Sequence, residues 1–207
     1  MTLWQHVVGA IRARGATPPA AEPVPIGWTE LVFSSRAAVA NPTKLMIVAH
    51  PDDESLFGGE ALTSSRGWTV VCVTNATHEE RRREFASAMT SIGANYTILG
   101  HFDHLESGNF NGRLDEQLRE LIEEFPYEMI VTHNERGEYG HPQHRAVHRI
   151  VRRVAGTRPI YVFAHPRLVR PRVSTAKWRL LDHYASQCVS IAHAWPIASR
   201  ERLRRLQ

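Results

Sequence analysis

Short apolar runs alternate with amphipathic stretches along most of this chain, and this alternation constrains its fold more than any other feature. The apolar runs predict strands at residues 44–49, 69–74, 96–99, 129–132 and 160–164. Helical spacing predicts helices at residues 55–66, 79–92, 115–124 and 142–154. Continuous apolar strands separated by helices are typical of a mostly parallel sheet with helices on both faces. We therefore predict a Rossmann-like α/β fold with the strand order 3-2-1-4-5.

The two ends of the chain differ from this pattern. Residues 2–14 carry apolar side chains at helical spacing, and the Pro/Ala-rich stretch 17–27 predicts an extended connector. We accordingly assign residues 1–43 to an N-terminal helix and connector, and residues 44–207 to one compact domain. Near the C-terminus we expect a helix over about 174–187 and a basic helix over about 199–206.

Composition narrows the class of protein. The chain has 207 residues, of which 43% are hydrophobic and 22% charged, as in ordinary globular domains. It has no apolar run long enough to span a membrane, and its first residues do not resemble a secretory signal. Two isolated cysteines do not form a disulfide framework, so we expect a cytoplasmic protein. The sequence does not reveal its oligomeric state.

Charge is distributed unevenly along the sequence. Residues 1–144 hold 11 basic and 19 acidic side chains, whereas residues 145–207 hold 14 basic and 2 acidic ones. A basic C-terminal third could face nucleic acid, an anionic substrate or an acidic partner. We find no aromatic interleaving or nucleic-acid motif there, so the pattern favours an arginine-rich solvated surface over a nucleic-acid partner.

Two motifs follow predicted strands. The sequence HPDDE starts at His50, directly after the first strand, and YGHPQH starts at Tyr139, shortly after the fourth. In the predicted order these strands are neighbours, and the chain reverses direction between them. Ligands of open α/β sheets bind beyond the carboxyl ends of such strands. We therefore expect the two loops to meet and form a site.

The side chains in these loops suit one divalent cation. The first loop offers one imidazole and two or three carboxylates, and the second offers two imidazoles three residues apart. A mixed His/Asp set without thiolates suits Zn²⁺, Fe²⁺ or another first-row divalent metal better than calcium or magnesium. Three protein ligands would leave a position for water, as in catalytic zinc sites. The alternative interpretation is a pair of turns, with one aspartate capping a helix.

The two motifs resemble the LmbE/PIG-L family of metal-dependent N-acetylglucosamine deacetylases. The resemblance rests on AHPDDE at residues 49–54 and EYGHPQHRAVH at residues 138–148, and it extends over about residues 43–190. It implies a Rossmann-like fold, a zinc ion, and a small N-acetylamino sugar or glycoconjugate as substrate. It also implies the release of acetate from that substrate by a metal-activated water.

Roles for individual residues follow from the same resemblance. His50, Asp53 and His144 correspond to the metal ligands, and Asp52 to the general base. His141 corresponds to the charged or proton-donating partner of the reaction intermediate, and Tyr139 to a residue that approaches the substrate. Many bacterial members have an acid at the position of Gln143, and we expect the glutamine to orient the neighbouring imidazole of His141 by a hydrogen bond.

Three other functions remain open at this point. One is a deacylase that acts on a different small amide. The second is a non-haem iron enzyme, because two histidines and one carboxylate also form its metal-binding triad. The third is a basic protein that binds nucleic acid. We expect eight of the other nine histidines to be surface or packing residues: His78, His101, His104, His133, His148, His165, His183 and His193.

Overall fold

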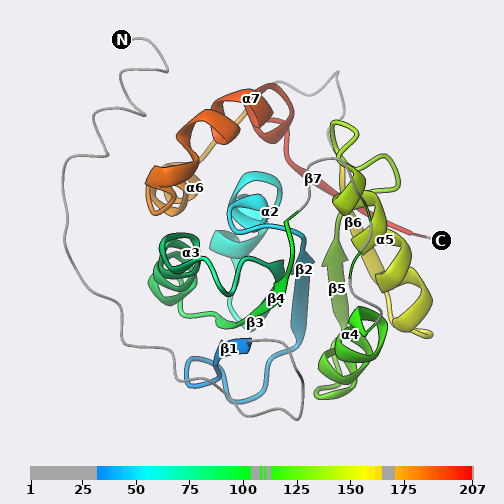
Figure 1. The fold of residues 1–207 in the computed structure, drawn as a ribbon. Helices are drawn as coiled ribbons and strands as arrows, with labels where there is room; N and C mark the ends of the chain where they lie inside the picture. Colours follow the sequence, from blue (N-terminus) through cyan, green and yellow to red (C-terminus); the bar gives the residue numbers. More distant parts are fainter. Residues whose placement is uncertain (1–31, 104–107, 109, 111–112, 165–170, 207) are drawn as a thin grey trace, which may run out of the picture.

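A seven-stranded mixed sheet forms the centre of the computed structural model, which describes residues 32–103, 108, 110, 113–164 and 171–206. The strands are β1 (Val32–Ser35), β2 (Lys44–Val48), β3 (Trp68–Thr74), β4 (Asn95–His101), β5 (Met129–Thr132), β6 (Ile160–Ala164) and β7 (Arg202–Arg205). Their order is β1-β4-β3-β2-β5-β6-β7 (Figure 1). The five central strands are parallel, and β1 and β7 pair antiparallel at the two edges. The central five confirm the predicted order 3-2-1-4-5.

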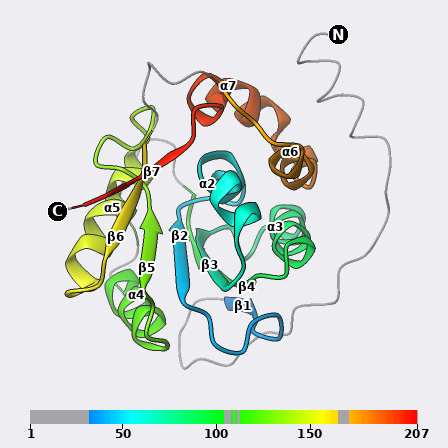
Figure 2. The same ribbon diagram turned by 180° about the vertical axis from the view of Figure 1, so that it is seen from behind.

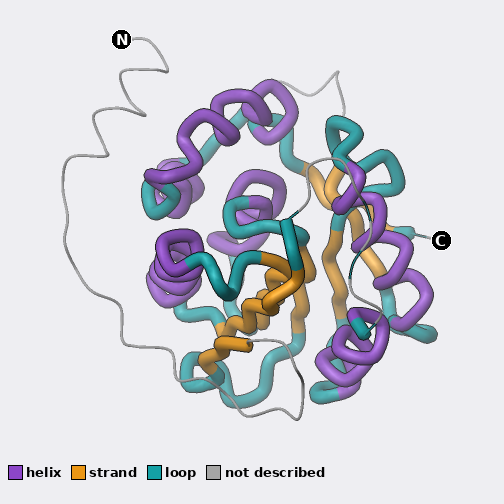
Figure 3. The backbone as a smooth tube through the Cα atoms, in the orientation of Figure 1, coloured by secondary structure: helices purple, strands orange, loops and turns teal. Residues whose placement is uncertain are grey.

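Helices cover both faces of this sheet (Figures 1 and 2). They are α2 (Asp53–Ser64), α3 (Glu79–Ser91), α4 (Leu114–Glu123), α5 (Pro142–Val154), α6 (Thr175–Leu181), the 3₁₀ turn η1 (Ala185–Gln187) and α7 (Cys188–Ala198). The tube drawing shows the strands between two layers of helices, with α4 and α5 on one side and the others opposite (Figure 3). The predicted α/β class with helices on both faces is therefore confirmed.

Alternation along the strands builds the two halves of the core. In β2, Met46 and Val48 pack into the cluster that includes α2, α3, α6 and α7. Leu45 and Ile47 point to the opposite face, into the cluster with α4 and α5. All four side chains are completely buried. Because both faces of the sheet are covered, β2 is apolar from Leu45 to Val48, which is the pattern that the sequence shows.

Three expectations for the ends of the domain need correction. The basic segment near the C-terminus is strand β7, not a helix; Leu203 packs against the core while Arg202 and Arg204 are exposed. The helix expected over 174–187 ends at Leu181, and a further helix, α7, follows η1. Strand β1 belongs to the sheet, although it lies within the range 1–43 that we placed ahead of the domain. The helix expected at residues 2–14 lies outside the described residues.

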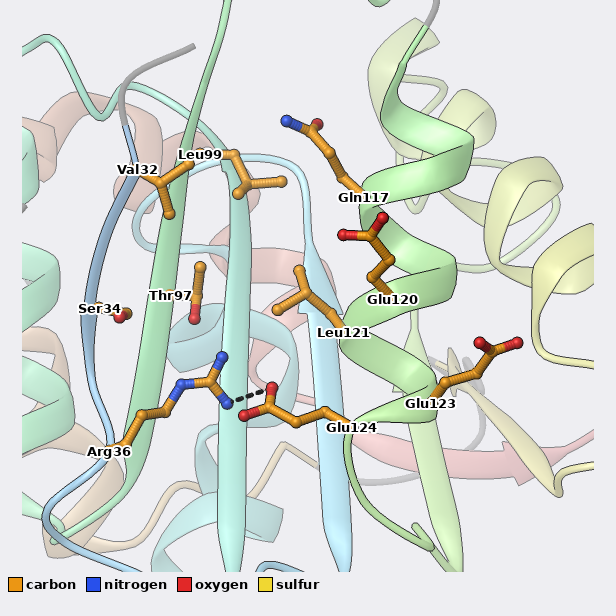
Figure 4. Close-up of a pocket in the computed structure, with 10 residues that line it drawn as sticks. All are labelled: Val32, Ser34, Arg36, Thr97, Leu99, Gln117, Glu120, Leu121, Glu123 and Glu124. Carbon is orange, nitrogen blue, oxygen red and sulfur yellow. Dashed lines mark ion pairs between the residues drawn. The ribbon is translucent and has the colours of Figure 1, made fainter. Parts of the chain in front are cut away.

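A groove of about 620 Å³ lies between α4 and the edge of the sheet formed by β1 and β4 (Figure 4). Its walls include the apolar side chains of Val32, Leu99 and Leu121, and an ion pair joins Arg36 to Glu124 across it. Its lining residues belong to neither of the two motifs. In the part of the chain that the structure describes, no helix is long and apolar enough to cross a membrane.

Candidate active site

The first motif forms a tight turn between β2 and α2. The amide of Asp53 donates to the carbonyl of His50, and α2 begins at Asp53 itself. The Asp53 carboxylate accepts a hydrogen bond from the His50 amide at 2.8 Å, which holds the two side chains together. Asp52, between them, has a φ of 113° and lies in the left-handed region that residues other than glycine rarely adopt. The residues of the first motif therefore determine the conformation of the turn as well as supplying its polar side chains.

The second motif leads from β5 into α5. His141 is the N-cap of this helix, and Pro142 follows at its first position, where proline is favoured. Gly137 has a positive φ, and a Cβ there would lie 2.6 Å from the carbonyl oxygen of His141, so the loop requires glycine. His144 is the third residue of α5 and is completely buried. The expected meeting of the two loops is observed.

Three donor atoms from the two motifs converge on one point. His50 Nδ1 lies 3.2 Å from Asp53 Oδ2 and 3.2 Å from His144 Nε2, and the latter two atoms are 3.3 Å apart. A tetrahedral ion with ligand bonds of about 2.0–2.2 Å places its donor atoms about 3.3–3.6 Å apart. The three atoms therefore have almost the spacing that such an ion needs.

Hydrogen bonds to the outer nitrogens direct both imidazoles toward this point. Glu138 lies 2.7 Å from Nδ1 of His144, and Gln143 Oε1 lies 2.8 Å from Nε2 of His50. These acceptors favour the tautomers in which the inner nitrogens, His144 Nε2 and His50 Nδ1, keep their lone pairs. Such outer partners are usual for metal-binding histidines, because they fix the tautomer and orient the ring.

Two further histidines stand beside the cluster and could form alternative sets of ligands, His50 with His141 and His144, or Asp53 with His133 and His144. The His133 ring stacks on His144 with 3.9 Å between ring centroids. However, its Nε2 accepts the amide of Ala49 at 2.9 Å while its Nδ1 faces Glu138 at 2.8 Å. Both nitrogens are thus engaged, which argues against His133 as a ligand. The sequence analysis did not place His133 in the site.

His141 stands at the more open side of the cluster. Its ring lies 4.7 Å from that of His50 and 4.5 Å from that of His144, measured between centroids. Its Nδ1 accepts the amide of Gln143 at 3.3 Å, so Nε2 carries the proton in the neutral ring. Tyr139 is 45% exposed, and its ring lies 5.9 Å from that of His141, at the mouth of the site.

Asp52 is buried beside two charged residues, Arg81 on α3 and Asp103 just after the end of β4. Its carboxylate lies 3.8 Å from the guanidinium of Arg81. That guanidinium also donates to Asp103 at 2.9 Å, and Asp103 lies 3.3 Å from Nε2 of His50. Asp103 therefore lies beside His50 in the site, whereas His104 lies outside the described residues.

Electrostatics separate the roles of the two adjacent aspartates. Burial, together with the charge of Asp53, raises the pKa of Asp52 well above its usual value. Burial would also raise the pKa of Asp53, but His144 and His133 outweigh it and hold the pKa well below the usual value. Asp53 is therefore a permanent anion among imidazoles, while Asp52 can accept and keep a proton.

The imidazoles of His141 and His50 also have pKa values that are shifted in opposite directions. Burial and the neighbouring His144 and His50 lower the pKa of His141 to about 4, so its ring is neutral near pH 7. Burial opposes protonation of His50 too, but Asp103 and Asp53 raise its pKa to about 10. The negative charge around His50 favours a cation, and a divalent ion at this point would take the place of the proton.

One expectation about the second motif is wrong. The side chain of Gln143 does not orient His141; its oxygen holds His50, and its amide donates to the carbonyl of Phe102 at 2.8 Å. Glu138 also emerges as a residue of the site that sequence reasoning missed. Its carboxylate is fully buried between His133 and His144, which lowers its pKa to about 2 despite the opposing effect of burial.

Comparison with known proteins decides the family. Residues 45–155 match the family described as "PIG-L: GlcNAc-PI de-N-acetylase", and this segment includes both motifs. The chain belongs to the PIG-L family. The resemblance noted from the sequence is therefore confirmed.

Similar proteins include relatives in a virus and in bacteria. Protein L374 of Acanthamoeba polyphaga mimivirus is 37% identical over 125 residues, covering 52% of this chain and 56% of the viral protein. The 1D-myo-inositol 2-acetamido-2-deoxy-alpha-D-glucopyranoside deacetylase 1 of Catenulispora acidiphila is 29% identical over 161 residues, covering 56% and 50% of the two chains. This PIG-L chain thus spans about half the length of these relatives.

Solved structures share the fold. The A40926 pseudoaglycone deacetylase Dbv21 superposes with a TM-score of 0.55 at 20% identity, covering 73% of this chain and 85% of its own. A deacetylase of teicoplanin biosynthesis gives a TM-score of 0.54 at 19% identity, covering 72% and 86%. At these identities the likeness establishes the fold alone.

Proposed function

We propose that this PIG-L protein is a metal-dependent hydrolase that removes the acetyl group from an N-acetylglucosamine-containing glycoside. The observation that carries the proposal is the convergence of His50 Nδ1, Asp53 Oδ2 and His144 Nε2 at 3.2–3.3 Å, next to a buried carboxylate. The description of the family and the names of the bacterial relatives support deacetylation as the reaction and an acetamido sugar as the substrate.

His50, Asp53 and His144 would hold the cation. Their donor set of two imidazoles and one carboxylate suits zinc or another first-row divalent ion. When bound in such a site, the ion polarises an amide carbonyl and lowers the pKa of water toward neutrality. Glu138 and Gln143 keep the two imidazoles turned toward the cation, and the buried negative charge of Asp53 adds to its attraction.

Asp52 is the proposed general base. It stands directly beside the ligand Asp53 and takes the proton from the water that attacks the acetamide carbon. Because burial and Asp53 raise the pKa of Asp52, its carboxyl retains that proton until the C–N bond breaks. It then delivers the proton to the nitrogen of the leaving amine, and acetate and the free amino sugar result.

His141 and Tyr139 are the proposed stabilisers of the oxyanion that forms when water attacks. With its pKa lowered to about 4, His141 is neutral and acts as a hydrogen-bond donor through Nε2 rather than as a charged acid. Burial and the surrounding carboxylates raise the pKa of Tyr139, so its hydroxyl also keeps its proton and can donate. The proton for the leaving group therefore comes from Asp52 in this scheme.

A direct assay tests this function. Metal-free protein would be reconstituted with zinc, iron(II) or cobalt(II), and incubated with a panel of short N-acetylglucosamine glycosides, N-acetylated amino acids and anilides. We expect release of free amine from the glycosides, and a loss of about 10²–10⁴-fold in rate for Asp52→Asn with full metal content. An intact panel of sugars alongside stoichiometric metal would overturn the sugar assignment, and cleavage of another amide would replace it.

A further inference from the structure

Asp52 is held in an unusual backbone conformation in the middle of the first motif. It is one of three residues other than glycine with a positive φ in the described part of the chain, with φ 113° and ψ −29°. Such a conformation persists only where surrounding interactions determine it, and it is often found where function needs it. The question is which contacts hold Asp52 there.

Glu54 supplies one of these contacts through a fully buried carboxylate. Its Oε2 accepts the amide of Asp52 at 3.2 Å, two residues back along the chain. Its Oε1 accepts the hydroxyls of Ser55 and Tyr184, each at 2.5 Å. Glu54 thus joins the backbone of Asp52 to a tyrosine 130 positions further along the sequence.

Tyr184 is fixed from both sides in the turn between α6 and η1. Next to it, His183 Nδ1 lies 2.9 Å from the hydroxyl of Ser87 on α3. On its other side, Ser186 donates its amide and hydroxyl to Glu84, also on α3, at 2.7 and 2.6 Å. Tyr184 itself is 1% exposed, and burial next to Glu54 raises its pKa well above 10, so its hydroxyl remains a donor.

We propose that Tyr184 and Glu54 are positioning residues, which hold the backbone of Asp52 in its left-handed conformation and so place its carboxylate for proton transfer. The inference rests on the proposed function, because Asp52 is the base only in that reaction. It assigns a role in the site to the α6–η1 turn, which lies outside both motifs and carries no ligand of the proposed cation.

Two substitutions with almost unchanged shape test this inference. Tyr184→Phe removes one donor to Glu54. Glu54→Gln replaces one acceptor oxygen with an amide nitrogen, so either the Asp52 amide or the Tyr184 and Ser55 hydroxyls lose their acceptor. Tyr127→Phe is the matched control. Tyr127 is also buried (3% exposed), but it lies just before the N-terminal end of β5, whereas the site lies at the C-terminal end.

Each zinc-loaded variant would be crystallised and assayed. For Tyr184→Phe and Glu54→Gln we expect kcat to fall about tenfold to a hundredfold while KM and zinc affinity stay within about twofold, because a small misplacement of a catalytic group is costly. We also expect the φ of Asp52 to leave the left-handed region in at least one variant. Tyr127→Phe should match the wild type in both readouts.

The crystallographic readout separates this inference from the proposed function. If the wild type cleaves no acetamido sugar, the function is wrong, but a shift of Asp52 in the variants would still establish the positioning role. Suppose instead that the wild type is active, and that both variants keep the wild-type kcat and the left-handed conformation of Asp52. The positioning role is then refuted, while the proposed function stands.

Discussion

His50 Nδ1 and His144 Nε2 lie 3.2 Å apart, although 94 positions separate the two residues in the sequence. Each nitrogen points inward because its partner nitrogen on the same ring faces an acceptor, Gln143 or Glu138. The carboxyl ends of β2 and β5, which are neighbours in the sheet, bring the two rings together. The arrangement suits a cation site at the reversal point of a parallel sheet, as we propose.

Removal of either imidazole should abolish stoichiometric metal binding. In His50→Ala or His144→Ala, two donor atoms remain of three, and we expect the zinc retained after dialysis to fall from one ion per chain to a small fraction. Elemental analysis of the dialysed protein measures this. His78→Asn is the control, because His78 is exposed at the start of α3 and asparagine also caps helices well. Full zinc retention in both alanine variants would contradict the assignment.

Glu138 should tune the affinity of the site without touching the cation. Glu138→Gln weakens the acceptor that His133 and His144 share, so His144 becomes a poorer ligand. We expect zinc affinity to fall about 10- to 100-fold. Competition with a chromophoric chelator measures the affinity. Glu135→Gln, in the same loop but exposed and paired with Arg204, should leave it unchanged; equal affinities for both variants would exclude the role of Glu138.

A buried ion pair should stabilise the attachment of the C-terminal elements to α2. Lys177 Nζ lies 2.7 Å from Glu201 Oε2, and Glu201 also accepts the amides of Glu60 and Ala61 at 3.0 Å. Glu201→Gln leaves the Lys177 charge uncompensated, so we expect the free energy of unfolding in urea to fall by about 3–5 kcal/mol.

An exposed ion pair provides the comparison for this measurement. Asp115 pairs with Arg153 on the surface of the molecule, between α4 and α5. Asp115→Asn should cost at most about 1 kcal/mol, as is usual for exposed pairs. Similar losses in the free energy of unfolding for Glu201→Gln and Asp115→Asn would show that the buried pair stabilises the fold no more than the exposed one.

His183 should make the fold less stable in mild acid. Burial lowers its pKa from the model-peptide value of 6.5, so below about pH 6.5 the unfolded chain binds the proton more readily than the folded one. Its contribution to stability is therefore present above that pH and is lost as the pH falls. We expect the wild type to lose more stability between pH 7.5 and 5.5 than His183→Asn, as measured by urea unfolding. Parallel losses in the two proteins would contradict this.

Much of the fold follows from local sequence pattern. The five central strands carry apolar runs because both sheet faces are covered, and α4 and α5 show a clear apolar face, so the alternation of strands and helices and the strand order could be predicted. The edge strands could not, because VFSS in β1 and RLRR in β7 are short and partly polar. Their conformation depends on pairing with β4 and β6, which no local pattern records.

Sequence reasoning gave roles to histidines and aspartates inside the two motifs and passed over two other buried neighbours. His133 is a single histidine outside both motifs, and Glu138 opens the second motif but received no role. His133 directly follows β5, however, as His50 follows β2 after one residue. Its position at the carboxyl end of a central strand was therefore the signal that could have placed His133 in the site. The side chain of Gln143 reaches His50 in the other loop, a tertiary contact that sequence spacing does not reveal.

The position of a bound cation tests the central claim most directly. Crystals of the zinc-loaded protein, measured at the zinc absorption edge, should show one anomalous peak within about 2.0–2.2 Å of His50 Nδ1, Asp53 Oδ2 and His144 Nε2. A peak bonded to His133 instead of His50, or no peak between the two motifs in protein that contains zinc, would contradict the account.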